Sequence, residues 1–258
     1  MEKEDTLLRK RLIELSDLAY QRGIVTYSDF LNLNELHILH TTPKDSFSVP
    51  YRTFGGYPFS ERQMAAFLPD AFYMYRNEEE IRQSFPMSIV KTAPLHAKYS
   101  ENLGHRDYLG ALLNLGIERS KLGDILLHDG VAYIFVSEAL SEFVCEELTR
   151  VRNTTVQGMI VESADFIYTP RSEEIRGTVA SVRLDSLLSL ACNSSRSKLT
   201  ALIEGGRVYV NGKLITSNGY HVKDDDMISV RGMGRFQYKG ILSESKKGRR
   251  YVSIYKYI

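Results

Sequence analysis

Several features that define large classes of protein are scarce in this 258-residue sequence, which has no tryptophan and only two cysteines. Cys145 and Cys192 lie far apart and outside any Cys-x-x-Cys or Cys/His cluster, so we expect reduced thiols, no disulfide framework and no metal site. The longest apolar run, Val131 to Val136, is far too short to span a bilayer, and the N-terminal Met-Glu-Lys-Glu-Asp lacks the basic start of a secretory signal. We therefore expect a cytoplasmic protein without a membrane span.

An excess of one charge is also missing from the whole chain, since 33 lysines and arginines face 32 aspartates and glutamates. The distribution is uneven, however. Residues 183–258 hold 14 basic and 6 acidic residues, a net charge of +8, whereas residues 1–182 hold 19 and 26, a net charge of −7. Because clustered cations attract polyanions, this asymmetry predicts a basic tail domain that meets nucleic acid or a membrane surface.

The first segment, residues 1–77, has the pattern of a small α+β unit. Leucines at three- and four-residue spacing predict a helix that ends at Gly23, and Ser28 is a candidate cap for a second helix. An extended piece follows, and Ser60-Glu61-Arg62-Gln63 has the capping-box order of a third helix. Arg52 and Arg62 could touch RNA, but arginines on a surface and a turn-forming Gly-Gly are the commoner explanation, which we favour.

The central segment, residues 78–163, alternates strand and helix patterns in the order β-α-β-β-α-β. This is the ferredoxin-like arrangement shared by RNA-recognition (RRM-like) modules and many unrelated proteins, so it indicates the fold better than the function. Tyr133 and Phe135 fall on one face of the third expected strand, where such modules stack bases. The glycine-aromatic signature of those modules is missing, and we favour an aromatic pair covered by other parts of the protein.

Residues 164–180 include Thr169-Pro170-Arg171-Ser172-Glu173-Glu174, which is polar and broken by proline, so we interpret them as a linker. Residues 181–258 then form the basic domain, which ends in a hairpin. Its first helix starts after Arg183, and Ser194 or Ser195 caps a second helix that ends at Gly205-Gly206. Asn211-Gly212 supplies the positive φ angles of a tight hairpin turn.

The start of the second helix is the strongest candidate for binding. Its amides and the positive end of its dipole favour a phosphate, and Arg196 and Lys198 add positive charge in the first turn. Ser195 is either a cap or a direct phosphate donor. The candidate RNA-binding residues are Arg183, Ser195, Arg196, Lys198, Arg207 and Lys213.

This basic stretch resembles the RNA-binding S4 domain, which is named after a protein of the small ribosomal subunit. The resemblance rests on Arg-Leu-Asp at Arg183, a Ser-Arg-Ser-Lys helix start, the run from Ile203 to Gly212, and Asp226-x-Ile228. Members of that family usually have Gly-Asp in the last loop, where this chain has Asp224-Asp225-Asp226. Aspartate tolerates the left-handed conformation, so the fold is still expected.

Further motifs extend the resemblance over nearly the whole length: Gly55-Gly56-Tyr57, His105-Arg106-Asp107-Tyr108-Leu109-Gly110, Gly123-Asp124-Ile125 and Ser229-Val230-Arg231-Gly232. Together they resemble the YlmH family of Gram-positive bacteria. The resemblance implies an α+β architecture with an N-terminal α+β unit, a central RRM-like domain and a C-terminal S4 domain. It also implies binding to the large ribosomal subunit, through its ribosomal RNA and peptidyl-tRNA, in rescue or quality control of stalled translation, with a link to cell division. We expect a monomer.

Three functions remain open at this stage. We favour a non-catalytic RNA-binding protein without a cofactor, because no G-x-G-x-x-G loop occurs and Arg183-Leu184-Asp185 belongs to the basic module. The alternative is an RNA-modifying enzyme, of pseudouridine synthase or methyltransferase type, with a site in residues 50–130. A weaker alternative is membrane association through Lys246-Lys247-Gly248-Arg249-Arg250, which we interpret instead as a solvated hairpin turn.

Overall fold

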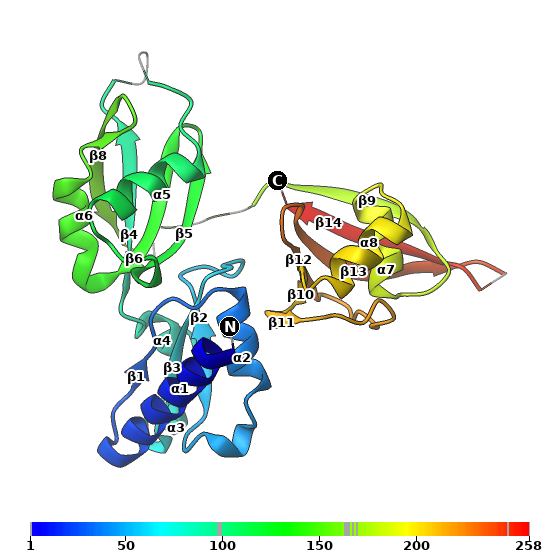
Figure 1. The fold of residues 1–258 in the computed structure, drawn as a ribbon, viewed down its shortest axis with the longest axis horizontal. Coiled ribbons are helices and arrows are strands. Elements are labelled where there is room, and N and C mark those ends of the chain that lie inside the picture. Colours follow the sequence, from blue (N-terminus) through cyan, green and yellow to red (C-terminus); the bar gives the residue numbers. More distant parts are fainter. Residues whose placement is uncertain are drawn as a thin grey trace. The chain divides into compact units, whose positions relative to one another are not determined.

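The structure is a computed structural model that describes residues 2–96, 100–162, 166, 168, 170–246 and 248–257. Helices and antiparallel sheets are mixed along the chain (Figure 1), which confirms the expected α+β class. The chain divides into two compact units, Met1–Tyr168 and Thr169–Ile258. The first unit therefore contains both the N-terminal and the central segment.

The N-terminal portion of the first unit packs helices against a three-stranded antiparallel sheet of order β1-β3-β2. Helix α1 stops where Gly23 takes a φ of +64°, as the sequence predicts. The elements in chain order are α1 (Glu2–Arg22), β1 (Thr26–Tyr27), α2 (Leu33–Thr41), the 3-10 helix η1 (Lys44–Ser46), β2 (Tyr51–Phe54), β3 (Met64–Phe67), α3 (Asp70–Tyr75) and α4 (Glu78–Gln83).

Two expected helix starts in this portion are wrong. Helix α2 is capped by Asn32, whose side chain accepts hydrogen bonds from the amides of Asn34 and Glu35, and not by Ser28. No helix begins at Ser60, because the following residues form strand β3 between β1 and β2. All four residues of β3 are buried, so pairing with two distant strands outweighs the local capping signal.

The central portion has the β-α-β-β-α-β order that the sequence predicts. Its sheet runs β5-β6-β4-β8-β7, the ferredoxin-like arrangement with a short strand added at one edge. Helices α5 and α6 cover one face of this sheet, where Tyr108, Leu112 and Val144 pack on Ile134 and Val136. The elements are β4 (Met87–Pro94), α5 (His105–Asn114), η3 (Arg119–Lys121), β5 (Leu122–His128), β6 (Val131–Ser137), η4 (Glu138–Leu140), α6 (Ser141–Glu147), β7 (Arg150–Val151) and β8 (Thr154–Val161).

The opposite face of the central sheet carries the aromatic pair of β6, and the N-terminal portion covers it. The Phe135 ring is fully buried and lies 5.2 Å from the ring of Tyr57 and 5.4 Å from that of Phe166. Tyr133 lies 5.2 Å from Phe166. A base cannot stack on Phe135 in this arrangement, so the interpretation of a covered aromatic is confirmed for Phe135, whereas Tyr133 is only half-buried.

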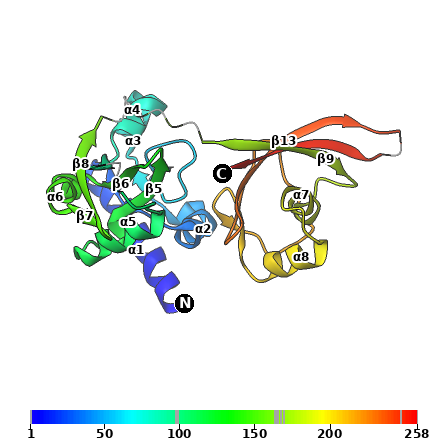
Figure 2. The same ribbon diagram turned by 90° about the horizontal axis from the view of Figure 1, so that it is seen from above.

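The C-terminal unit is a six-stranded antiparallel sheet with two helices on one face. Figure 2 shows α7 and α8 together on one side of the sheet, whose strand order is β11-β10-β12-β13-β14-β9. The elements are β9 (Ser172–Val179), α7 (Leu184–Ala191), α8 (Arg196–Glu204), β10 (Val208–Val210), β11 (Lys213–Leu214), β12 (Met227–Val230), β13 (Gly234–Glu244) and β14 (Arg250–Tyr257).

Two turns of this unit take the backbone conformations that the sequence predicts. Asn211 and Gly212 have φ angles of +49° and +75°, as a tight two-residue hairpin requires. Asp225 has a φ of +65°, so aspartate does adopt the left-handed conformation in the loop where S4 relatives usually have glycine. Its loop stays attached to the sheet through the amide of Asp225, which donates to the carbonyl of Tyr238 over 2.7 Å.

The expected linker at residues 164–180 is wrong over most of its length. Residues 172–179 form the edge strand β9, which pairs with β14 from Ser172 opposite Tyr257 to Val179 opposite Arg250. Ile175, Gly177 and Val179 point toward the helices, while the residues between them are polar. Polar residues are common on an edge strand. Because of them, the sequence pattern indicated a linker instead of a strand. Residues 163–165, 167 and 169 lie outside the described residues.

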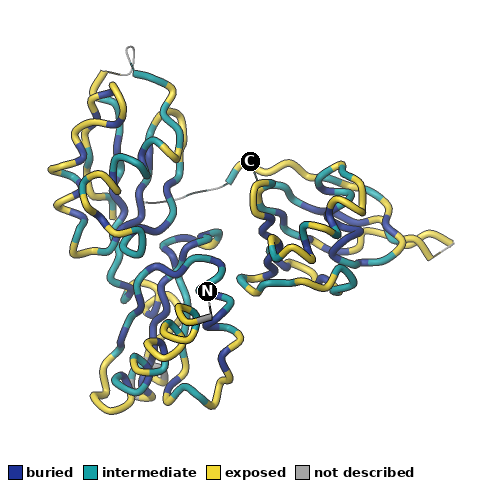
Figure 3. Tube along the Cα trace, viewed as in Figure 1, coloured by how far each residue is buried: buried dark blue, intermediate teal, exposed yellow. Residues whose placement is uncertain are grey.

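The basic run at residues 246–250 closes the long hairpin of β13 and β14. The amide of Ser245 donates to the carbonyl of Arg249 over 2.8 Å, and the amide of Gly248 donates back to Ser245 over 2.9 Å. Figure 3 shows that the hairpin tip is exposed. The expected hairpin turn is confirmed, although Lys247 lies outside the described residues.

Candidate nucleic-acid interface

The two helices of the C-terminal unit are held together by an apolar contact that leaves the N-terminal end of α8 at the surface. Leu184, Leu187 and Leu188 of α7 and Leu199 and Ile203 of α8 are all fully buried in one core with the sheet. Since these side chains occupy the inner sides of the helices, the polar residues at positions 195–198 face outward, and all four are exposed.

The start of α7 is closed by protein groups. Arg183 donates from Nε and a terminal nitrogen to the Asp185 carboxylate, over 3.2 and 3.3 Å. The Asp185 side chain is only 9% exposed and also accepts the amide of Ser186 over 2.9 Å. The loop before β12 occupies the first amides of the helix, because Leu184 and Asp185 donate to the carbonyls of Tyr220 and Asn218. Arg183 is thus partly neutralised in the free protein.

The start of α8 is different, because its first amides face outward. The Ser195 hydroxyl accepts the amide of Lys198 over 3.4 Å, which makes Ser195 the N-cap. Within the described part of the chain, the amides of Arg196 and Ser197 have no hydrogen-bond acceptor. Orphan amides, the positive end of a helix dipole and two cations at one exposed end are features that favour a phosphate oxygen.

A hydrogen-bonded chain connects the two helix starts. The Arg196 guanidinium contacts the Ser186 hydroxyl, and that hydroxyl also contacts Asp185, the partner of Arg183. Arg183 and Arg196 therefore lie on either side of Asp185 and Ser186. We name the four surface residues at this place the helix-start cluster: Arg183, Ser195, Arg196 and Lys198.

The sequence did not predict one basic residue near this cluster, Lys256. Burial raises the pKa of the Cys192 thiol, while the nearby charges of Lys256 and Lys198 oppose that rise. Both lysines therefore lie close to the turn between α7 and α8. Lys256 is on the last strand, and strand alternation from the buried Ile254 places it on the helix side of the sheet. Only the pairing of β14 could have revealed this, because 60 positions separate Lys256 from the helix start at Arg196.

The two remaining candidate residues lie at the other end of α8. Arg207 follows Gly206 at the C-terminal end of the helix, and its carbonyl accepts the amide of Arg231 over 2.9 Å. Lys213 opens β11 opposite Val210 in the tight hairpin. Both side chains are exposed. A nine-residue helix is about 13 Å long, so Arg207 is a basic position separate from the helix-start cluster, and Lys213 lies further on, at the turn of the hairpin.

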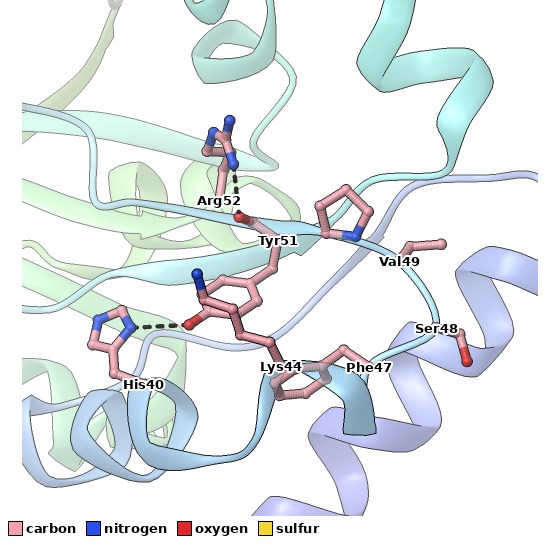
Figure 4. Close-up of a pocket in the computed structure, with 8 residues that line it drawn as sticks. His40, Lys44, Phe47, Ser48, Val49, Tyr51 and Arg52 are labelled. Atoms are coloured by element: carbon pink, nitrogen blue, oxygen red, sulfur yellow. Dashed lines mark hydrogen bonds between the residues drawn. The ribbon is translucent and has the colours of Figure 1, made fainter.

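The N-terminal portion contains a pocket of about 500 Å³ between η1 and β2 (Figure 4). Its polar groups are engaged with one another: His40 Nδ1 lies 3.1 Å from the Tyr51 hydroxyl, and Arg52 donates to the Tyr51 carbonyl over 3.2 Å. The lining residues, His40, Lys44, Phe47, Ser48, Val49, Pro50, Tyr51 and Arg52, include no carboxylate and no cysteine. The pocket therefore lacks the paired groups of an acid–base site.

The described residues contain no group of three or more histidines, cysteines, aspartates or glutamates that could hold a metal ion. None of their helices is long and apolar enough to cross a membrane.

Comparisons with known proteins show what this chain is similar to. Residues 83–165 match the model of the putative RNA-binding domain in YlmH, and residues 182–228 match the S4 domain. A Bacillus subtilis protein named ribosome-associated protein quality control protein P2 is 28% identical over 251 residues, which is 96% of this chain and 93% of that protein. The chain is thus similar to YlmH proteins over nearly its whole length. The resemblance that the sequence motifs carried is confirmed.

Further relatives show how far the likeness extends. The match to the solved structure of the cell division protein ylmH from Streptococcus pneumoniae covers 64% of this chain and 95% of that chain, with a TM-score of 0.51 and 21% identity, which supports the fold. Two uncharacterized RNA pseudouridine synthases match shorter stretches. The one from Mycoplasma pneumoniae is 41% identical over 22% of this chain and 19% of its own length, and the one from Aquifex aeolicus is 31% identical over 30% and 37%.

Proposed function

We propose that this protein binds structured RNA through the helix-start cluster and acts on the ribosome. The observation that carries the proposal is the exposed start of α8, where unpartnered amides of Arg196 and Ser197 meet the charges of Arg196 and Lys198. The arginine fork can grip a phosphate with two hydrogen bonds, and lysine supplies a point charge. Arg207 and Lys213 would extend the contact along the backbone of the same RNA.

The ribosome is favoured as the partner by the Bacillus subtilis relative, which is aligned over nearly the whole chain and is named as ribosome-associated. We propose that the protein contacts ribosomal RNA of the large subunit and peptidyl-tRNA in rescue or quality control of stalled translation. Such a role would place it in the cytoplasm, as a monomer. The name of the Streptococcus pneumoniae relative supports a link to cell division.

We propose further that the protein does not catalyse a reaction on RNA. The second candidate is an RNA-modifying enzyme, which the names of two partial relatives favour. Those matches cover less than a third of this chain, whereas the quality control relative covers 96% of it. Mass spectrometry of ribosomal and transfer RNA, with and without the gene, distinguishes the two. A modified nucleotide that disappears on deletion and returns with purified protein would establish the enzyme instead.

Sedimentation through a sucrose gradient tests the binding role. Wild-type protein should travel with large subunits, more so when ribosomes are stalled, and Arg196→Ala should shift it to the top fractions. Ser186→Ala removes the hydrogen-bond partner of Arg196 but keeps its charge, and Lys10→Ala removes one positive charge from exposed α1. Both controls should sediment like the wild type. Equal sedimentation of Arg196→Ala and wild type, with both folded, would refute the role of the cluster.

A further inference from the structure

The sheet of the C-terminal unit has a second face, on the side away from α7 and α8 (Figure 2). The side chains that point to the helices are apolar and buried, among them Phe236, Tyr238, Val252 and Ile254. The residues between them point the opposite way, because side chains alternate along a strand. We name this surface the open face, and its members are Glu174, Arg176, Met227, Ser229, Arg231, Arg235, Gln237, Lys239, Tyr251, Ser253, Tyr255 and Tyr257. Tyr209 of β10 has the same register but is only 1% exposed, so it is not a member.

Strand register places tyrosines beside cations on the open face. Tyr257 pairs directly with Arg235, and its hydroxyl donates to Gln237 over 2.6 Å. Lys239 Nζ lies 6.0 Å from the centre of the Tyr255 ring. Neighbours on one face of a strand are about 6.6 Å apart, so Tyr255 and Tyr257 form a row of two rings on β14 with positive charge along β13.

A second aromatic–cation pair lies across the sheet from this row. The Arg231 guanidinium lies 5.3 Å from the centre of the Tyr209 ring. Tyr209 pairs with Ser229, Ser229 with Arg235, and Arg235 with Tyr257, so the four residues form one row across β10, β12, β13 and β14. Tyr209 is only 1% exposed and Ser229 6%, so Arg235 and Tyr257 are the residues of this row that a ligand can reach.

The charge of the open face is positive. Its cations are Arg176, Arg231, Arg235 and Lys239, and the carboxylates beside them are Glu174 and Asp225. Each carboxylate already has a cationic partner, since Arg176 donates twice to Glu174 over 2.8 Å and Lys239 contacts Asp225. Beyond Tyr251, the hairpin of β13 and β14 carries three basic residues, Lys246, Arg249 and Arg250, and one acidic residue, Glu244.

We propose that the open face binds an unpaired RNA strand, with bases stacked on Tyr255 and Tyr257 and phosphates near Arg235 and Lys239. This inference rests on the proposed RNA-binding function and adds a second class of RNA to it. Aromatic rings with interleaved cations suit single strands, because every base has a π-face and the backbone follows the positive groove. The polar Ser229, Gln237 and Ser253 on the same face do not suit an apolar protein partner.

Two variants of Tyr255 test the stacking. The probe is a fluorescent oligouridylate of roughly eight nucleotides, long enough for a site of this kind, titrated against the full chain. Tyr255→Ala should weaken binding about tenfold, as expected for the loss of one stacked base. Tyr255→Phe keeps the ring and should bind like the wild type. Melting curves identify any variant that fails to fold, and Lys239→Ala then serves as a second variant that should also weaken binding.

A hairpin RNA in a parallel titration separates this inference from the proposed function. Arg196→Ala should weaken binding to hairpin RNA and leave oligouridylate binding unchanged. Tyr255→Ala should weaken oligouridylate binding and leave binding to hairpin RNA unchanged. Wild-type protein that binds the hairpin but not oligouridylate would overturn the open-face inference alone. Oligouridylate binding that is equal in wild type, Tyr255→Ala and Lys239→Ala would also overturn it. Failure of wild type to bind the hairpin would overturn the proposed function.

Discussion

The hydroxyl of Tyr57 donates a hydrogen bond to Oδ2 of Asp124 over 2.8 Å and so joins the N-terminal portion of the first unit to its central sheet. The same carboxylate accepts the amide of Glu61 over 2.7 Å and that of Arg62 over 3.1 Å. Arg62 in turn donates to the carbonyls of Leu122, Phe30 and Arg119. Two motifs that carried the family resemblance, Gly55-Gly56-Tyr57 and Gly123-Asp124-Ile125, therefore meet at one joint.

Removing the Asp124 carboxylate should destabilise the first unit. Asp124→Ala leaves the Tyr57 hydroxyl and the amides of Glu61 and Arg62 without their acceptor, which costs about 2–4 kcal/mol of unfolding free energy. Tyr57→Phe removes only one hydrogen bond and should cost about 1 kcal/mol. Chemical denaturation measures both. Equal losses in the two variants would show that the backbone amides do not depend on Asp124.

Gly56 is required at the joint for two reasons. Its φ is +95°, and a Cβ there would lie 2.3 Å from the Phe135 ring. Gly56→Ala should therefore cost roughly 2–4 kcal/mol, the sum of backbone strain and a core clash. Gly116→Ala is the matched control, since Gly116 has a φ of +83° and nothing within 4 Å of the added atom. Gly116→Ala should lower the free energy of unfolding only by the cost of backbone strain, roughly 1 kcal/mol. Similar losses at both glycines would contradict the proposed clash.

Asp185 should stabilise the fold and weaken RNA binding at the same time. Asp185→Asn removes the partner of Arg183 and a nearly buried charge, so we expect a loss of about 1–3 kcal/mol of stability. The neutral side chain no longer repels phosphate beside the helix-start cluster, so affinity for hairpin RNA should rise. Glu204→Gln, at the far end of α8, should change neither quantity much. A fall in RNA affinity for folded Asp185→Asn would contradict this account.

The parts of the fold that the sequence predicted are those set by local chemistry. Ser195 caps α8 and Asn211-Gly212 forms its turn because each conformation depends on a few neighbouring residues. Strands β3 and β9 were missed because distant pairing creates them, against a capping signal at Ser60 and a polar, proline-containing context after Pro170. Lys256 near the helix start depends on the same long-range register. The sequence alone therefore could not show which basic side chains are neighbours in space, because that depends on how the sheet is assembled.

Strand β9 should be necessary for a stable C-terminal unit. A fragment that begins at Ala180 lacks β9, which exposes the edge of β14 and leaves Leu190 without its contact at Gly177. A fragment from Pro170 to Ile258 keeps both, so it should unfold cooperatively and at a higher temperature. Circular dichroism during heating measures the difference. Identical melting of the two fragments would show that residues 170–179 act as a linker after all.

Salt dependence should reveal how many phosphates the helix-start cluster neutralises. For hairpin RNA and the full chain, log K should fall with log salt by roughly 0.7–0.9 for each phosphate contact. Arg196→Ala should weaken binding and reduce that slope by about one contact, because both the side chain and its share of the α8 anion site are lost. Its melting temperature should stay close to that of the wild type, since the side chain is exposed.

Arg196→Lys separates charge from geometry in the same titration. Lysine keeps the positive charge, so the slope should equal that of the wild type, but it cannot form two parallel hydrogen bonds to a phosphate, so affinity should fall at every salt concentration. If Arg196 only fastens α8 to Ser186, the result is different. Both variants would then lose stability and keep the wild-type slope, and once folding is corrected for, their RNA affinity would be unchanged.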